Sequence, residues 1–270
     1  MKLHDTLVDF HMHTNCSDGA WTPSRLFEEI RTRRLEYFSI SDHDTMDAYP
    51  VPTDLQDRCI AGLEIDTETR GQTVHVLAYS MNRLDGRLMS RLKQQRLHRA
   101  TRAEAIVERL NKSGVDLTFE QVLEVAKTSE SIGRPHIARA LVEKNYSVSI
   151  QAAFDEFLAE GCCAYVALDR LSTAEGIELI HEAGALAVLA HPRRLRDQVG
   201  LPEFCKLFDG VEIVHPSADH EYVQKMLDLV DANALIATGG TDFHARPGDS
   251  GIGIALPAPR VSQLLERLHT

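Results

Sequence analysis

The chain has 270 residues, of which 43% are hydrophobic and 26% are charged, a balance typical of one large globular domain with or without a modest insert. Its net charge of −11 argues against a binder of long duplex nucleic acid, because neutralisation of phosphates by basic residues supplies most of that affinity. The sequence has no apolar run of membrane-spanning length, no signal-peptide pattern and no CxxC pair among its five cysteines. We therefore expect a cytoplasmic protein with reduced thiols and no membrane partner.

Seven short apolar runs predict strands, and amphipathic segments with a helical period separate most of them. The predicted strands cover residues 6–11, 37–41, 59–65, 73–79, 185–190, 211–215 and 235–238. Between the first two strands, Thr22 is a typical N-cap and Pro23 suits the first helical position, so a helix should run to about Arg33. This alternation favours parallel βα units in an α/β fold.

The alternation stops between about residues 85 and 165, where only helical signals occur. Thr118 and Gln121 form a capping-box pattern, and further helices are predicted near residues 136–144 and 149–158. We therefore expect three segments: the first part of the α/β body at residues 1–98, a helical insert at residues 99–165, and the second part of the body at residues 166–270.

Histidine or acidic residues stand at the C-terminal end of one predicted strand after another. His11 and His13 alternate along the first strand and so share one face, and Asp18 follows in the next loop. Later strands add the candidates His43, Glu64, His75, His191, His215, Asp242 and His244. Any single one of these groups could equally be an ordinary residue of the core. The carboxyl ends of parallel strands, however, meet at one face of a barrel. The joint pattern therefore predicts one shared site.

Mixed histidine and carboxylate ligands without thiolates suit Mn, Fe or Zn at hydrolytic sites. About nine candidate ligands exceed what one metal ion can bind, whereas two or three ions bridged by a carboxylate could use them all. Such clusters hold both the attacking and the leaving oxygen of a phosphoryl transfer and generate hydroxide at neutral pH.

The ordered motifs HMH, SDG, SDHDT, GLE, VHVLAY, AHP and GTDFH resemble those of the PHP (polymerase and histidinol phosphatase) family of metal-dependent phosphoesterases. They run from His11 to His244, which is nearly the whole chain. The resemblance implies a distorted (β/α)7 barrel with a small helical insert, and a trinuclear metal cluster at the C-terminal mouth of the barrel.

The resemblance also implies a role for each candidate residue. The three metal positions would be held by His11, His13 and Asp242; by Glu64, His75 and His191; and by Asp18, His43 and His244. Glu64 would bridge the first two ions, and catalysis would depend on Glu64, Asp242, His191 and His43. Other members have histidine at the position of Asp18. Asp42, Asp44 and His215 would orient ligands, and His215 could also contact substrate.

The helix that begins at the GRPH motif offers a second feature of the predicted site. Arg134 and His136 lie in its first turn, where free N–H groups and an arginine would bind a phosphate. The alternative is an ordinary helix start with Pro135 near its first position. In the nucleotide-acting branch that this segment resembles, a second phosphate is held away from the metals. We expect Arg134 and His136 to hold it, with Arg193 or Arg194 as alternatives.

A basic stretch from Arg83 to Arg102 precedes this motif. We expect it to be a solvated helix face, because runs of charged residues usually lie in solvent. The alternative is a surface that binds along RNA.

The expected activity is that of a phosphoric monoester hydrolase that removes the 3′-phosphate from nucleoside 3′,5′-bisphosphates, converting pAp to AMP and phosphate with a metal-activated hydroxide. Two or three divalent ions are expected, with Mn²⁺ as the first choice and Fe or Zn as alternatives. The same site would suit a 5′-3′ exoribonuclease acting on short 5′-phosphorylated RNA, or a phosphatase of the histidinol-phosphate type. A non-catalytic scaffold is disfavoured because the ligand set is intact.

Overall fold

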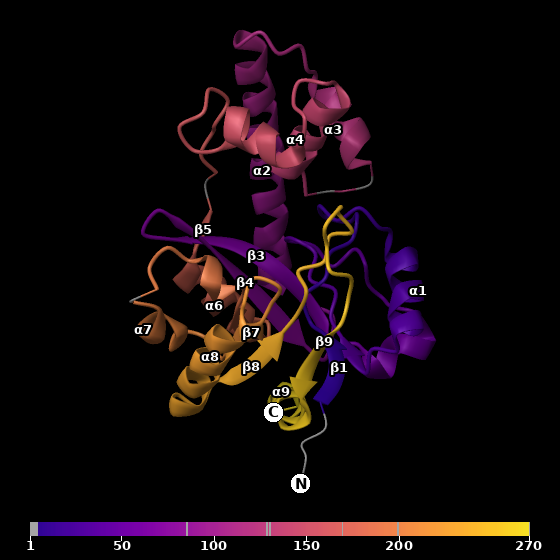
Figure 1. Ribbon diagram of the computed structural model, residues 1–270, viewed down its shortest axis with the longest axis vertical. Helices are drawn as coiled ribbons and strands as arrows, with labels where there is room; N and C mark the ends of the chain where they lie inside the picture. The colour runs from indigo at the N-terminus through magenta and orange to yellow at the C-terminus, as the bar shows by residue number, and fades with distance from the viewer. Residues whose placement is uncertain are drawn as a thin grey trace.

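The computed structural model describes residues 5–84, 86–127, 129, 131–168, 170–198 and 200–269, and it has a mixed α/β fold (Figure 1). A six-stranded sheet has the order β5-β3-β4-β6-β7-β8, and a three-stranded sheet has the order β2-β1-β9. The strands are β1 (Asp5–Asp9), β2 (Tyr37–Phe38), β3 (Ala61–Thr69), β4 (Gln72–Ser80), β5 (Leu171–Ser172), β6 (Leu186–Leu189), β7 (Gly210–Val214), β8 (Ile236–Gly239) and β9 (Ile254–Pro257). The α/β class and the seven predicted strands are confirmed, and β5 and β9 were not predicted.

Backbone hydrogen bonds join the two sheets at both edges. On one side, the amide of Phe10 after β1 donates to Gly239 O of β8 over 3.2 Å. On the other side, the amide of Ile60 before β3 donates to Phe38 O of β2 over 2.9 Å. The ends of β1, β2, β3 and β8 are thereby held next to one another.

The prediction that all strands are parallel is wrong for β4, which runs antiparallel to both β3 and β6. The two residues Arg70 and Gly71 connect β3 to β4, and both have positive φ angles of 52° and 73°. This is the conformation of a tight type I′ hairpin turn, which leaves no room for a crossover helix.

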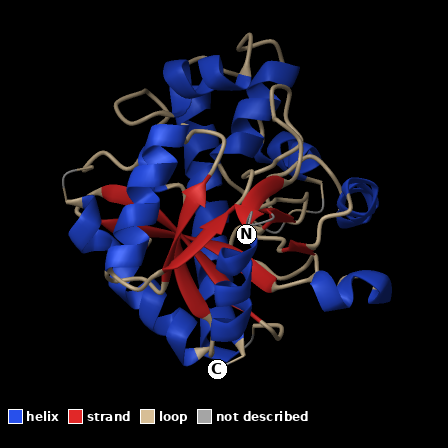
Figure 2. Cartoon of the chain, turned by 60° about the horizontal axis from the view of Figure 1, so that its bottom comes forward, coloured by secondary structure: helices blue, strands red, loops and turns tan. Residues whose placement is uncertain are grey.

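Helices surround the strands, and α3 and α4 lie together with part of α2 beyond one end of the sheets (Figures 1 and 2). The α-helices are α1 (Pro23–Arg33), α2 (Gly86–Lys112), α3 (Phe119–Ala126), α4 (Arg134–Glu143), α5 (Ile150–Ala153), α6 (Thr173–Glu182), α7 (Leu201–Cys205), α8 (His220–Ala232) and α9 (Ala258–Leu268). Short 3₁₀ helices occur at η1 (Thr53–Arg58) and η3 (Pro192–Arg194), and η2 (Phe154–Leu158) is a π-helix. The predicted N-cap of α1 and the predicted capping box of α3 are both confirmed.

Helix α2 extends from the sheets into the group of helices above them (Figure 1). Leu88 and Leu92 in its first half pack in the core formed by β3, β4 and β6. Ile106 and Leu110 in its second half belong to a separate apolar cluster with α3 and α4. One regular helix therefore connects two hydrophobic cores. In the described part of the chain, no helix is long and apolar enough to cross a membrane.

Candidate metal centre and adjoining anion site

His11 and His13 lie just after β1, and both side chains are fully buried. The loop after β8 passes so close to them that a Cβ on Gly240 would lie 2.4 Å from the Cβ of His11 and 2.6 Å from its backbone nitrogen. A glycine at this position therefore allows the loop to bring Asp242 beside His11 and His13. The Asp242 Oδ1 lies 3.5 Å from His11 Nε2 and 3.3 Å from His13 Nε2.

Glu64 occupies the centre of the site, in the middle of β3, and only 1% of it is exposed. Its carboxylate oxygens lie between 2.8 and 3.3 Å from ring nitrogens of the surrounding histidines, namely His11, His13, His43, His75 and His191. Glu64 is thus placed to bridge cations bound on either side of it.

The described residues form four groups in which potential ligand atoms lie within 4.8 Å of one another. Three of them contain the sets expected from the sequence: His11, His13, Glu64 and Asp242; Glu64, His75 and His191; and Asp18, His43 and His244 joined by His13. The fourth group, His43, Asp66 and His75, includes a carboxylate that the sequence reasoning missed. Asp66 follows Glu64 by two residues on the same strand, so period-two alternation was the signal that could have found it.

The donor set fits divalent cations. Among the residues that the structure describes, His11 Nε2, both ring nitrogens of His13, His43 Nδ1 and Asp18 Oδ1 are buried without a hydrogen-bond partner. Buried polar atoms are normally paired, and these atoms instead belong to side chains whose potential ligand atoms converge within 4.8 Å of one another. Imidazole nitrogens and carboxylate oxygens that converge in this way are the ligands that Mn, Fe and Zn prefer.

The electrostatics of the site keep its carboxylates charged. Burial alone would raise the pKa of the Glu64 carboxyl, but the neighbouring His11, His75 and His43 rings hold that pKa well below its usual range. The pKa of Asp242 is also well below normal, because His11 and His244 outweigh its burial. Burial lowers the pKa of His43 to about 4, so its imidazole is neutral and keeps a lone pair for a cation. Against the effect of burial, Asp242 and Glu64 raise the pKa of the His13 imidazole to about 10, so a cation that binds this ring must displace a proton.

Buried carboxylates orient several of these ligands. Glu212, whose role sequence reasoning missed, lies 3.0 Å from His11 Nδ1 and accepts the backbone N–H of His191 over 2.7 Å. Asp42 was expected to orient ligands, and it accepts hydrogen bonds from the amide and hydroxyl of Thr14 and from the Ser17 hydroxyl, in the loop that carries Asp18.

The other two residues expected to orient ligands differ from each other. Asp44 contacts Arg99 and Gln95 of α2 and no ligand histidine among the described contacts. His215 lies behind Asp242, with its Nε2 3.6 Å from the Asp242 Oδ2. The His215 Nε2 is thus too far away for a hydrogen bond and has none among the described residues, whereas Asp44 fixes the helix that lines the site.

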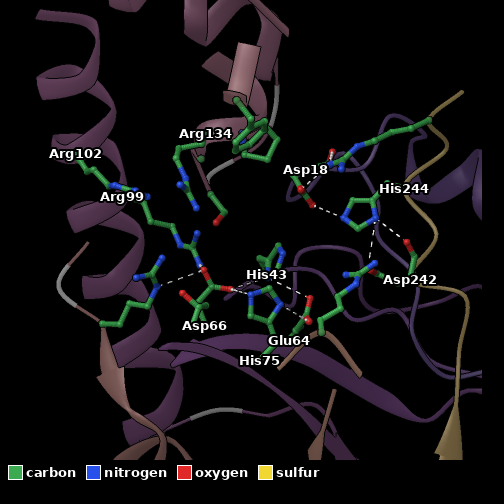
Figure 3. Close-up of a pocket in the computed structure, with 18 of the residues that line it drawn as sticks. Asp18, His43, Glu64, Asp66, His75, Arg99, Arg102, Arg134, Asp242 and His244 are labelled. Atoms are coloured by element: carbon green, nitrogen blue, oxygen red, sulfur yellow. Dashed lines mark hydrogen bonds and ion pairs between the residues drawn. The ribbon is translucent and has the colours of Figure 1, made fainter. Parts of the chain in front are cut away.

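A cavity of about 430 Å³ has on one wall Arg99, Arg102, Arg134 and Arg170, on the side of α2 and α4 (Figure 3). The candidate ligands that line it are Asp18, His43, Glu64, Asp66, His75, Asp242 and His244. Arg99 pairs with Asp44 and Asp66, but in the described part of the chain neither Arg102 nor Arg134 has a carboxylate partner. Burial, together with repulsion from the other three arginines, lowers the pKa of Arg102 to about 9. Such unneutralised cations at a cavity wall form an anion site.

The interpretation of the basic stretch as a solvated face is wrong for its last part. Arg99 and Arg102 are only 8% exposed, on the inner side of α2. Arg87 does lie at the surface, where it pairs with Glu182. Sequence reasoning could not separate the two faces, because basic residues follow one another on all sides of this helix.

Arg134 lies in the first turn of α4 and lines the cavity, as expected. Its guanidinium carbon lies 5.5 Å from the centre of the Phe154 ring, and its Nη1 donates to Leu158 O over 3.3 Å. The two ends of the π-helix η2 thus hold the side chain in place. Arg194 donates to Asp242 Oδ2 over 2.8 Å and lines the opposite wall.

The remaining substrate-binding candidates face elsewhere. His136 is buried behind the cavity wall: its Nδ1 accepts the amide of Gly133 over 3.1 Å, and its Nε2 lies 3.1 Å from Ser17 O. With both ring nitrogens engaged by the backbone, His136 has no nitrogen left for a phosphate. Arg193 pairs with Asp219 at the surface and stacks on Tyr222.

A further arginine, Arg246, was missed, and it donates to Asp18 Oδ2 over 2.7 Å.

Known proteins resemble the chain over most of its length. No family model matches it. A candidate metal-dependent phosphoesterase of Bifidobacterium adolescentis has a solved structure that superposes with a TM-score of 0.85, at 30% identity over 96% of each chain. A 5′-3′ exoribonuclease of Salmonella typhimurium is 29% identical, over 88% of this chain and 85% of its own length. A 3′,5′-nucleoside bisphosphate phosphatase of Chromobacterium violaceum is 27% identical, over 90% of this chain and 89% of its own.

Proposed function

The chain belongs to the PHP family of metal-dependent phosphoesterases, and we propose that within this family it removes the 3′-phosphate from nucleoside 3′,5′-bisphosphates such as pAp. The observation that carries the proposal is that one cavity contains both a cation centre and an anion site. A substrate with two phosphates on one ribose would use both, with the reacting phosphate at the cations and the other at the arginines.

Arg134 and Arg102 are the residues that we assign to the phosphate that does not react. Neither has a carboxylate partner among the described residues, and Arg134 adds its charge at the N-terminal end of α4. Burial of both side chains strengthens their interaction with an anion, because solvent screens them less. His136 and Arg193 are not part of this anchor, because His136 is engaged by the backbone and Arg193 pairs with Asp219 at the surface.

The residues of the cation centre would bind two or three divalent ions, which we propose to be Mn²⁺, with Fe or Zn as alternatives. When bound, these ions would lower the pKa of water and neutralise charge on the reacting phosphate. Glu64 and Asp242 would keep the ions at a fixed separation, and Glu212 would hold His11 in one orientation. Arg194, beside Asp242, would stabilise charge that develops on the phosphate oxygens.

Phe154 gives the cavity an aromatic surface next to the anchor. A nucleobase stacks well on such a ring whatever its identity, because every base has a π-face. We propose that the base of the substrate lies here and that the enzyme discriminates little between bases.

A 5′-3′ exoribonuclease activity on short RNA is the second candidate. It would use the same anchor for the 5′-phosphate, and the exposed Arg194 and Arg246 on the other wall would face the continuing strand. A phosphatase of the histidinol-phosphate type would leave the arginine anchor without a use.

For the architecture, we propose that the seven predicted strands of the two joined sheets form the distorted barrel of the family; these are β1, β2, β3, β4, β6, β7 and β8. We further propose that residues 99–165 form a cap over its mouth. The separate apolar cluster of α3, α4 and the end of α2 supports this division.

The proposal is tested by comparing kcat/KM of the Mn-loaded enzyme on pAp, on a 5′-phosphorylated dinucleotide and on histidinol phosphate. We expect pAp to be the best substrate. A higher value for the dinucleotide would favour the exoribonuclease, and a higher value for histidinol phosphate would contradict both assignments.

The anchor makes a separate prediction. A charge-assisted contact is worth about 1.5–3 kcal/mol, so Arg134→Ala should lower kcat/KM on pAp about 10- to 150-fold. On a 3′-monophosphate, which lacks the 5′ group, the variant should act like the wild type. Arg193→Ala removes an arginine that faces Asp219 instead of the cavity and should change neither value. Equal losses on both substrates would mean that Arg134 serves the reacting phosphate or the fold.

A further inference from the structure

Asp66 lies between the cation centre and the arginine wall, and its two carboxylate oxygens face in different directions (Figure 3). Oδ2 lies 2.9 Å from Arg99 Nη2 and 3.9 Å from Arg170 Nε. Oδ1 lies 3.2 Å from His75 Nε2 and 3.5 Å from His43 Nδ1. Oδ2 therefore contacts the arginines, and Oδ1 faces the histidines.

The oxygen that faces the histidines has no hydrogen-bond partner among the described residues, although only 10% of the Asp66 side chain is exposed. His43 Nδ1, which faces the same point, is also buried without a partner. A buried carboxylate oxygen without a partner is costly, because it loses its hydration and gains nothing in return. A cation at this point would satisfy both atoms.

We propose that Asp66 is a cation ligand and that with His43 and His75 it completes a further cation position, beside those expected around Glu64. A neutral imidazole has one lone pair in its plane. His75 can present it from Nδ1, which lies 2.8 Å from Glu64, or from Nε2, which lies toward Asp66. The Asp66 position thus competes with the Glu64 position for His75 and with the position of Asp18 and His244 for His43, and it is the position nearer the arginine wall. The proposal rests on the metal centre of the proposed function, but its test needs no substrate.

Asp44 provides a matched control, because it is buried and binds the same arginine over 2.8 Å but does not face the histidines. Mn²⁺ binding to cation-depleted wild type, Asp66→Asn and Asp44→Asn is measured by titration calorimetry. We expect Asp66→Asn to lose one class of sites or to bind it at least about tenfold more weakly, as even residues behind a ligand have effects of this size. Asp44→Asn should bind as the wild type does. Unchanged binding by Asp66→Asn, or an equal loss in both variants, would overturn the proposal.

A second measurement uses the unaltered protein and so does not depend on how the variants fold. Wild-type crystals grown with Mn²⁺ are measured at the manganese absorption edge. An anomalous peak within bonding distance of Asp66 Oδ1 is expected. Manganese at other ligands, with none at Asp66, would mean that Asp66 only orients His75 and would overturn the proposal even if no nucleotide were ever hydrolysed.

Discussion

The carboxylate of Glu64 is shared by histidines that come from the ends of four different strands or loops. Because histidine nitrogens surround Glu64 on several sides, its carboxylate must be negatively charged and held in one position. Its burial removes competing water, and the histidines keep its pKa well below the usual range.

Replacing this charge should therefore remove cations from the protein. Glu64→Gln keeps the shape of the side chain but replaces the negative carboxylate with a neutral amide. We therefore expect elemental analysis to find at least one equivalent of Mn²⁺ less in the variant than in the wild type. Glu68→Gln, on the same strand but partly exposed, should retain the wild-type content. A Glu64→Gln protein with full cation content would contradict the bridging role.

At the scale of elements, the sequence was sufficient to predict every described strand except β5 and β9. Apolar runs locate β1 and β3, and the same pattern places His11 and His13 after β1 and Glu64 within β3. The direction of β4 was not predictable from that pattern, because alternation is the same in parallel and antiparallel strands; the turn at Arg70 and Gly71 decided it. Arg99 was missed for a similar reason, because its burial depends on α2 lying against Asp44 and Asp66 from distant strands.

The close approach of β8 to β1 makes a prediction at this scale. Gly240→Ala would place a Cβ within 2.6 Å of the backbone nitrogen of His11, so the backbone must shift. We expect a loss of about 1–3 kcal/mol in the free energy of unfolding, measured with urea, and weaker Mn²⁺ binding. Gly200→Ala meets only the side chain of Asp197, far from the ligands, and should leave Mn²⁺ binding unchanged. If Gly240→Ala binds Mn²⁺ normally, the position of His11 does not depend on this glycine.

For the whole molecule, the concentration of carboxylates at one site couples cation binding to stability. Asp18, Glu64, Asp66 and Asp242 are all buried within the same cavity wall. Cations that bind the folded chain and not the unfolded one stabilise the folded state by mass action.

Thermal unfolding should therefore depend strongly on cations. At 100 times its Kd, Mn²⁺ should stabilise the protein by about 2.7 kcal/mol for each site, which raises Tm by several degrees for a chain of this size. Circular dichroism melting curves in EDTA and in Mn²⁺ would measure this, and Glu64→Gln should show a smaller increase. Identical Tm values in both conditions would show that the site does not bind Mn²⁺ in the folded protein.

The continuity of α2 also constrains how the enzyme can change over evolution. Arg99 and Arg102 are three residues apart on a regular helix, so their heights differ by about 4.5 Å and both face the cavity. Insertion or deletion of one residue between them would rotate Arg102 by about 100° and carry it out of the cavity wall. A lineage can therefore change the spacing of Arg99 and Arg102 in the cavity wall only by substitution, and not by a change of length within this helix.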